Sequence, residues 1–307
     1  MRARRPSLAR LRQGFSPAAL VMYAATLTLE LPVVVLRLLL AYILALIALA
    51  ITGHPAIDAN TLSLVALLPT LWSVLALAWP GGSGWWWRQQ IGGRRPSQRE
   101  QLAYHDALEL LRDNTREPLT EPGMWFVLDT PEPDAAVLGN TLMLSRGLLE
   151  SPHLPAVLAH ELGHLATPDG QVTAALNRLV IHPAIYDPEP QERHHRRQPP
   201  LDDELFILIA VAVWAAKKLL AFLRGGLGLY LLHPIWGHYW RRREYTADQH
   251  AATLGQADEL ADFLEIHALL HDHPIPYIWL TDHTHPPTEL RIDQLRTHAH
   301  PDPEQAT

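Results

Sequence analysis

The sequence contains no cysteine and almost no lysine. Without cysteine the chain can form no disulfide framework, and neither thiol catalysis nor a cysteine-ligated metal site is available to it. Lys217 and Lys218 are the only lysines, so arginine carries nearly all of the positive charge. The formal net charge of −7 at pH 7 offers no basic surplus for a phosphate backbone, and we expect no nucleic acid partner.

Long uncharged runs, by contrast, are present near the N-terminus. Residues 33–51 hold a single charge, Arg37, and residues 61–79 hold none. Each run has about the length that a helix needs to cross a bilayer core of ~30 Å. Together they predict a transmembrane hairpin over residues 33–80, preceded by a tail and an interfacial or short helix over residues 1–32. The alternative is a buried helical hairpin in a soluble protein.

Arginines on both sides of this hairpin predict its orientation. They are absent from the loop between the two runs and occur before and after the hairpin, at Arg2, Arg4, Arg5, Arg10, Arg12, Arg88, Arg94, Arg95 and Arg99. Because positive loops stay on the cytoplasmic side, both ends of the hairpin are expected there. The sequence therefore predicts a multi-pass protein of the cell (inner) membrane whose folded domain is cytoplasmic and whose partners include the lipid bilayer.

A second apolar region, residues 205–240, is interrupted by charges and glycines. Lys217, Lys218 and Arg224 lie inside it, followed by glycines at 225 and 226. The pattern favours two helices joined at the glycines. These helices either cross the membrane as a full hairpin or lie in its interface, and the sequence leaves both options open.

From about residue 96 the pattern becomes that of a globular domain. The expected elements are a helix over 98–113, a strand over 124–129, a hairpin of two strands over 135–145 and a helix over 154–167. Leu102, Leu108 and Leu111 are expected near one face of the first of these helices. The glycine and asparagine at 139 and 140 are typical of a hairpin turn.

The helix over 154–167 contains His160-Glu161-Leu162-Gly163-His164, an H-E-x-x-H pattern. Residues four apart lie on one face of a helix, so both imidazoles can bind one metal ion, with Glu161 beside a bound water molecule. In a chain with 18 histidines the pattern alone is no proof of a site. Its apolar flanks are those of a buried helix, which favours a zinc site.

A catalytic zinc ion takes three protein ligands and leaves one position open for water. Thr167 and Gly170 stand where the metzincin pattern requires glycine and histidine, which excludes that class. The candidates for the third ligand are Asp169, Glu189, Glu192, His238, Glu244 and His250. Glu244 is favoured because Asp248 follows it by four residues and can hold the free N–H of a ligand histidine. The alternative is a solvated acidic helix face.

Three segments then resemble one family. Residues 142–164 ("LMLSRGLLESPHLPAVLAHELGH"), 243–255 ("REYTADQHAATLG") and 283–295 ("HTHPPTELRIDQL") are similar to membrane-embedded gluzincin peptidases, which include HtpX-type heat-shock proteases and C-a-a-X prenyl proteases. The resemblance implies one zinc ion per chain and assigns a role to each matching residue. The implied residues are His160, His164 and Glu244 as ligands, Glu161 as base, Asp248 behind a ligand, and His285 and Arg291 near the oxyanion. From the residues alone, His285 could equally be a structural turn residue.

The resemblance also implies a fold and an activity. The expected fold class is α+β, a mostly helical zincin-type metalloprotease domain with a small β-sheet, anchored by transmembrane helices. This domain covers residues 95–307, with the helical hairpin at 205–240 inserted. The expected protein is a zinc-dependent endopeptidase that cleaves unfolded or membrane-associated proteins on the cytoplasmic side. Its protein or peptide substrates would pair in extended form with the strand at Ala135, Ala136 and Val137.

Two alternatives remain. One is a site-specific processing or sensor-type peptidase with the same chemistry. The other is a non-catalytic membrane scaffold with a vestigial metal site.

Overall fold

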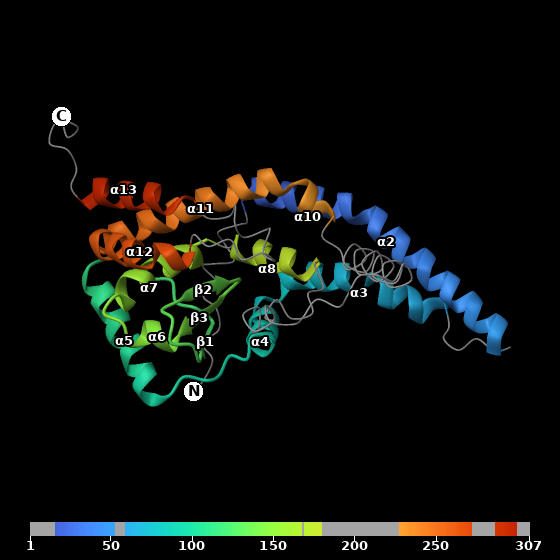
Figure 1. Cartoon of the computed structure of the whole chain (residues 1–307), viewed down its shortest axis with the longest axis horizontal. Helices are drawn as coiled ribbons and strands as arrows, with labels where there is room; N and C mark the ends of the chain where they lie inside the picture. The colour runs from blue at the N-terminus through green and yellow to red at the C-terminus, as the bar shows by residue number, and fades with distance from the viewer. Residues whose placement is uncertain (1–15, 53–58, 168, 180–226, 272–285, 300–307) are drawn as a thin grey trace, which may run out of the picture. The chain divides into compact units, whose positions relative to one another are not determined.

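The computed structural model describes residues 16–52, 59–167, 169–179, 227–271 and 286–299 (Figure 1). The chain divides into two compact units. The first contains Met1–Met22, Ala76–Ala174 and Leu232–Thr307, and the second contains Tyr23–Leu75 and Ala175–Leu231. The loop predicted at 186–204 and most of the apolar region predicted at 205–240 lie outside the described residues.

The first unit contains a three-stranded sheet in the order β1-β3-β2. β1 (Met124–Leu128) runs parallel to β3 (Thr141–Ser145), and β2 (Ala135–Leu138) runs antiparallel to β3 as the predicted hairpin. The turn of this hairpin has Gly139 at φ 64°, a conformation that glycine adopts without the steric cost of a side chain. β2 is consequently an edge strand, whereas the outer side of β1 carries a bridge to Arg94.

Helix α5 (Gln98–Asp113) has the predicted bounds. It begins with a capping box, in which Ser97 and Glu100 each accept a hydrogen bond from the backbone N–H of the other. Its buried side chains are Tyr104, Ala107, Leu108 and Leu111. The prediction for Leu102 is wrong, because this side chain is 57% exposed. Six positions along a helix turn the chain by about 600°, which leaves Leu102 about 120° from Leu108.

Helix α7 (Leu154–Leu165) forms the centre of the first unit. It follows the short α6 (Arg146–Leu149) and has a proline in its first turn, as predicted. Nearly all of its residues are buried, and it contacts β2, α5 and α11 (Figure 1). A helix that is covered on all sides must be apolar, which explains the apolar residues that flank the H-E-x-x-H pattern.

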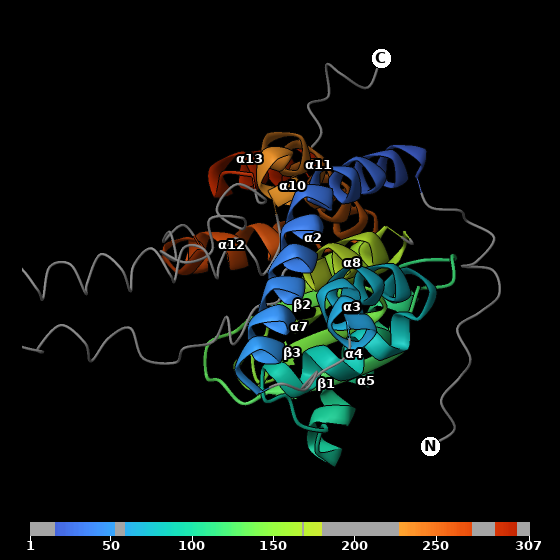
Figure 2. The same ribbon diagram turned by 90° about the vertical axis from the view of Figure 1, so that its right-hand side faces the viewer.

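Three further helices of the first unit follow in the sequence: α11 (His233–Thr253), α12 (Ala257–His271) and α13 (Thr288–Ala299). α11 packs along α7, and α13 packs against α11 and α12, as Figure 2 shows. α7 and α11 approach closely at Gly163, where an added Cβ would lie 2.8 Å from the Cα of Ala247. Gly163 thus allows the two helix backbones to meet.

Helix α4 (Pro80–Gln90) packs on the sheet of the first unit. Its Trp87 makes an edge-to-face contact with Phe126 of β1, with ring centroids 5.3 Å apart. Trp79, Trp85 and Trp86 are exposed. Aromatic side chains in such positions are typical of proteins that contact a membrane interface.

The second unit contains most of α2 (Pro17–Thr52), most of α3 (Ala59–Ala78), the end of α8 (Gly170–Leu179) and α10 (Leu227–Leu231). α2 and α3 are joined by a hydrogen bond of 2.7 Å between Tyr23 Oη and Ser73 Oγ. Among the described helices, α2 alone is long and apolar enough to cross a membrane, whereas α3 contains only a shorter apolar segment, Ala66–Leu77.

The structure differs from the sequence-based expectation at the start of α2. The interfacial or short helix predicted within residues 1–32 is not separate from the first membrane run, because from Pro17 onward the chain forms one continuous helix that includes Pro32. The buried carboxylate of Glu30 accepts a hydrogen bond of 2.8 Å from the backbone N–H of Gly228 in α10. This bond offsets the cost of burying an acidic residue within an apolar helix.

Candidate metal centre

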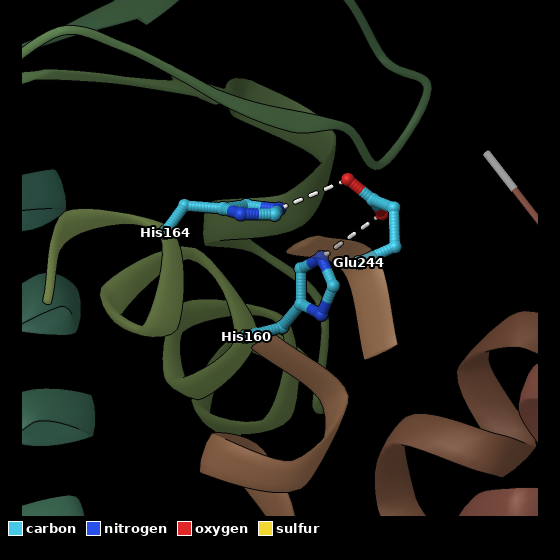
Figure 3. Close-up of side chains that lie close together, drawn as sticks. All are labelled: His160, His164 and Glu244. Atoms are coloured by element: carbon cyan, nitrogen blue, oxygen red, sulfur yellow. Dashed lines mark ion pairs between the residues drawn. The ribbon is translucent and has the colours of Figure 1, made fainter. Parts of the chain in front are cut away.

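Two helices bring together the three predicted metal ligands. His160 and His164 project from α7 toward the carboxylate of Glu244 on α11 (Figure 3). The distances are 3.6 Å from His160 Nε2 to Glu244 Oε2 and 3.2 Å from His164 Nε2 to Glu244 Oε1. One ligand atom from each residue lies within 4.8 Å of the others. The helical spacing of His160 and His164 therefore places them on one face, as expected.

The residues present fit a zinc ion. Zinc takes nitrogen and oxygen ligands at about 2.0–2.2 Å in tetrahedral geometry, so two of its ligand atoms lie about 3.4 Å apart. The two separations between a histidine Nε2 and the nearest Glu244 oxygen, 3.6 and 3.2 Å, lie on either side of this value. Two imidazoles and one carboxylate are also the ligand set of several catalytic zinc sites, with Glu161 adjacent to the first imidazole in the chain.

Asp248 lies behind His160, one helical turn beyond Glu244. One of its carboxylate oxygens is 2.9 Å from His160 Nδ1. Because a carboxylate accepts hydrogen bonds, this contact places a proton on Nδ1 and directs the Nε2 lone pair toward Glu244. The arrangement is the one predicted from the i, i+4 spacing of Glu244 and Asp248.

Arg291 of α13 holds Asp248 in turn. Its Nε and Nη2 donate hydrogen bonds of 2.9 and 2.7 Å to the two carboxylate oxygens of Asp248, and its Nη1 lies 3.6 Å from Glu244 Oε2. The guanidinium is buried and in bidentate contact with a carboxylate. The resemblance places Arg291 near the oxyanion, and its observed contacts are with Asp248 and Glu244.

The charged groups around His160 favour positive charge at the predicted metal site. Burial opposes protonation of His160, but hydrogen bonds with Asp248 and Glu244 outweigh burial and raise the pKa of His160 to about 10. Burial lowers the pKa of His164 to about 4, so this imidazole is neutral at neutral pH. The carboxylates that attract a proton to His160 attract a metal cation to the same lone pair.

The other predicted residues are not in the ligand cluster. Among the third-ligand candidates, His238 is exposed on α11, and Asp169 makes contacts elsewhere. Glu189, Glu192 and the predicted catalytic His285 lie outside the described residues. Ala135, Ala136 and Val137, the predicted substrate contacts, are half-buried on the edge strand β2, which packs against α7.

The structure adds one contact that the sequence reasoning missed. Arg243, which precedes Glu244, donates hydrogen bonds of 3.4 Å to the carbonyl oxygen of His164 and 3.3 Å to Thr173 Oγ1 of α8. It thereby joins the end of α7 to α11 beside the ligands. Its partners are distant in the sequence, and no local pattern indicates them.

A buried H-E-x-x-H helix, a carboxylate from a second helix and a small sheet beside them define a zincin-type metallopeptidase. The chain belongs to peptidase family M48, whose model matches residues 98–299. This match confirms the family predicted from the three sequence segments. Among the described helices, α2 alone has the length and apolar composition of a membrane span, so the second span of the predicted hairpin stays a prediction.

The structure is also similar to the crystal structure of S. mikatae Ste24p. The TM-score is 0.39 with 17% sequence identity, and the match covers 83% of this chain and 61% of that chain. No curated protein matches the sequence.

Proposed function

We propose that the protein is a membrane-bound zinc endopeptidase that cleaves unfolded or membrane-associated proteins on the cytoplasmic side. The observation that supports this best is the buried cluster of His160, His164 and Glu244, whose separations suit one zinc ion. Asp248 orients His160, and Arg291 holds Asp248 in place. A catalytic zinc site requires such contacts, whereas a vestigial site does not.

In the proposed mechanism His160, His164 and Glu244 hold the ion. When bound, zinc would polarise the scissile carbonyl and make a water molecule acidic enough to attack it at neutral pH. The carboxylate of Glu161 accepts the proton of that water molecule and then delivers it to the leaving amine. Asp248 keeps the Nδ1–H of His160 oriented, so the imidazole stays aligned throughout.

The edge strand β2 provides the proposed substrate site. An extended peptide can add to it through backbone hydrogen bonds along Ala135, Ala136 and Val137. This mode of binding depends on the backbone of the substrate more than on its side chains, so it suits unfolded segments of varied sequence. It supports an HtpX-like role in protein quality control over cleavage at one defined site.

The decisive experiment compares the wild-type protein with Glu161→Gln in detergent or vesicles. We expect wild-type protein with zinc to cleave casein and the variant to lose at least about 100-fold in kcat, since general acid–base catalysis contributes roughly 10²–10⁴-fold. Zinc content, measured by elemental analysis, should stay near one ion per chain in both. The exposed Glu150→Gln serves as the matched control. Full activity in Glu161→Gln would exclude the mechanism.

Substrate breadth is tested with a panel of unfolded proteins of unrelated sequence. Quality control predicts cleavage of most members at many sites. Cleavage of a single member at one bond would instead identify a site-specific processing peptidase.

A further inference from the structure

Asp169 is a buried carboxylate near the metal centre that has no part in the proposed mechanism. It follows α7, and its backbone carbonyl accepts hydrogen bonds from Val172 and Thr173 at the start of α8. Its side chain has an exposed fraction of only 7%. Burial of a charged group is costly unless it is paired or hydrogen-bonded, so the position of Asp169 calls for specific partners.

Two partners from distant parts of the chain meet at this carboxylate. The backbone N–H of Ser16 donates to Oδ1 over 3.0 Å, and the hydroxyl of Tyr239 donates to Oδ2 over 2.5 Å. Ser16 lies 153 positions and Tyr239 lies 70 positions from Asp169 in the sequence. All three residues belong to the first unit.

Ser16 marks the start of the apolar helix α2. Its Oγ accepts a hydrogen bond of 3.1 Å from the N–H of Ala19, which makes Ser16 the cap of this helix. The carboxylate of Asp169 thus lies at a helix N-terminus, where the macrodipole favours negative charge. Asp169 binds the first residues of α2 and the first turn of α8 at one point.

Tyr239 links Asp169 to α11, the helix that contains Glu244. It lies on α11 shortly before Glu244, and Arg243, one helical turn after Tyr239, donates to the carbonyl of His164 and to Thr173. Trp240 Nε1 also lies 3.5 Å from Thr173 Oγ1. The segment of α11 just before Glu244 is therefore held at Asp169 by Tyr239 and at the end of α7 by Arg243.

We propose that Asp169 and Tyr239 are positioning residues for the metal centre. They set the place of α11 along α7, and hence the separation of the Glu244 carboxylate from His164. Because the same carboxylate binds the N–H of Ser16, the start of α2 is part of the support of the site. This inference rests on the proposed zinc function.

The test uses the full-length protein and measures zinc affinity by competition with a chromophoric chelator. Tyr239→Phe removes the hydroxyl but keeps the ring, which packs edge-to-face on Trp236. We expect zinc to bind roughly 3- to 10-fold more weakly, below the 10- to 100-fold typical of groups bonded directly to a ligand. The metal-free variant should stay folded, with a loss of stability limited to the one hydrogen bond removed. Tyr104→Phe, a buried tyrosine of α5, is the matched control.

Hydrogen–deuterium exchange distinguishes the contact of Asp169 with Ser16 from its contact with Tyr239. In Asp169→Ala the amides at the start of α2 should exchange faster and zinc should bind more weakly, whereas Tyr239→Phe should weaken zinc binding alone. Wild-type zinc affinity in Tyr239→Phe would overturn the inference while leaving the proposed function intact. Absence of zinc binding by the wild-type protein would overturn both. If Asp169→Ala fails to fold, Tyr239→Phe decides the question by itself.

Discussion

Arg291 lies behind the predicted metal ligands with its guanidinium bound to both oxygens of Asp248. Burial opposes the charge on Arg291, but the hydrogen bond with Asp248 outweighs burial and raises the pKa of the guanidinium above its usual value. Burial also opposes the charge on Asp248, and hydrogen bonds with Arg291 and His160 keep the pKa of its carboxyl low. Each group thus keeps the other ionised in a buried place.

Substitution of Arg291 should weaken zinc binding more than it affects turnover of the loaded enzyme. Arg291→Lys removes the bidentate contact, and we expect zinc affinity to fall about 10- to 100-fold, as for other groups that orient a ligand. Arg291→Met leaves the buried Asp248 with His160 as its remaining partner, and we expect a cost of up to about 3–5 kcal/mol of stability. Chelator competition and urea unfolding measure the two effects.

A control variant distinguishes two roles for Arg291, which are support of Asp248 and contact with the oxyanion. The double variant Arg291→Met/Asp248→Asn removes both charges and should recover part of the stability without recovering zinc affinity. If Arg291→Lys instead binds zinc like wild type and loses only kcat, the guanidinium acts on the oxyanion.

Glu100 provides a test of stability against pH. The hydrogen bond from Arg94, with smaller contributions from Ser97, outweighs burial and lowers the pKa of Glu100 from 4.5 to about 2. The stability that this carboxylate contributes is present above pH ~4.5 and is lost as the pH falls through about 2. Glu100→Gln should cost about 1–2 kcal/mol at pH 7 through the cap and the ion pair.

The measurement is the difference in unfolding free energy between wild type and Glu100→Gln across this pH range. The difference should shrink steadily between pH ~4.5 and 2. A difference that stays constant with pH would show that the carboxylate charge contributes nothing to stability.

At the scale of helices, the centre depends on the crossing of α7 and α11. The two helices approach closely at Gly163 and Ala247, on the same part of α7 that holds His160 and His164. Only a residue without Cβ permits this approach, because the nearest atom is backbone and cannot move aside by rotation of a side chain. The glycine of the H-E-x-x-H pattern therefore sets the spacing of the ligand helices.

Gly163→Ala should force the helices apart. We expect a loss of about 1–3 kcal/mol in stability, typical of overpacking, even though alanine is the better helix former. Zinc affinity should also fall, because Glu244 moves with α11. Thr246→Ala, at an exposed position of α11, is the control and should change neither. Wild-type stability and zinc affinity in Gly163→Ala would show that the crossing tolerates a methyl group.

At the scale of the whole molecule, the absence of cysteine makes the proposed topology directly testable. If the predicted hairpin crosses the membrane, single cysteines at Ala56, between α2 and α3 in the sequence, and at Arg116, after α5, are expected on opposite sides of the membrane. In right-side-out vesicles a membrane-impermeant maleimide should label Ala56→Cys, whereas Arg116→Cys should react only after permeabilisation. Labelling of intact vesicles at Arg116→Cys would place the metallopeptidase domain outside.

The site could be predicted to a large extent from the sequence because its parts follow local spacing. His160 and His164, and likewise Glu244 and Asp248, stand four residues apart, and a helix converts that interval into a shared face. The hairpin of β2 and β3 follows in the same way from a glycine turn between two short apolar runs. These features depend on residues within one or two turns of each other.

Which helix faces pack against each other could be learned only from the tertiary structure. The contact of Arg291 with Asp248, the approach of α11 at Gly163 and the bonds of Asp169 to Ser16 and Tyr239 join segments far apart in the chain. No periodicity specifies such pairs, because each depends on how several helices pack at once. The sequence alone therefore predicted the residues that cluster at the centre and the family of the protein. The packing of α7, α11 and α13 determined how that centre is supported.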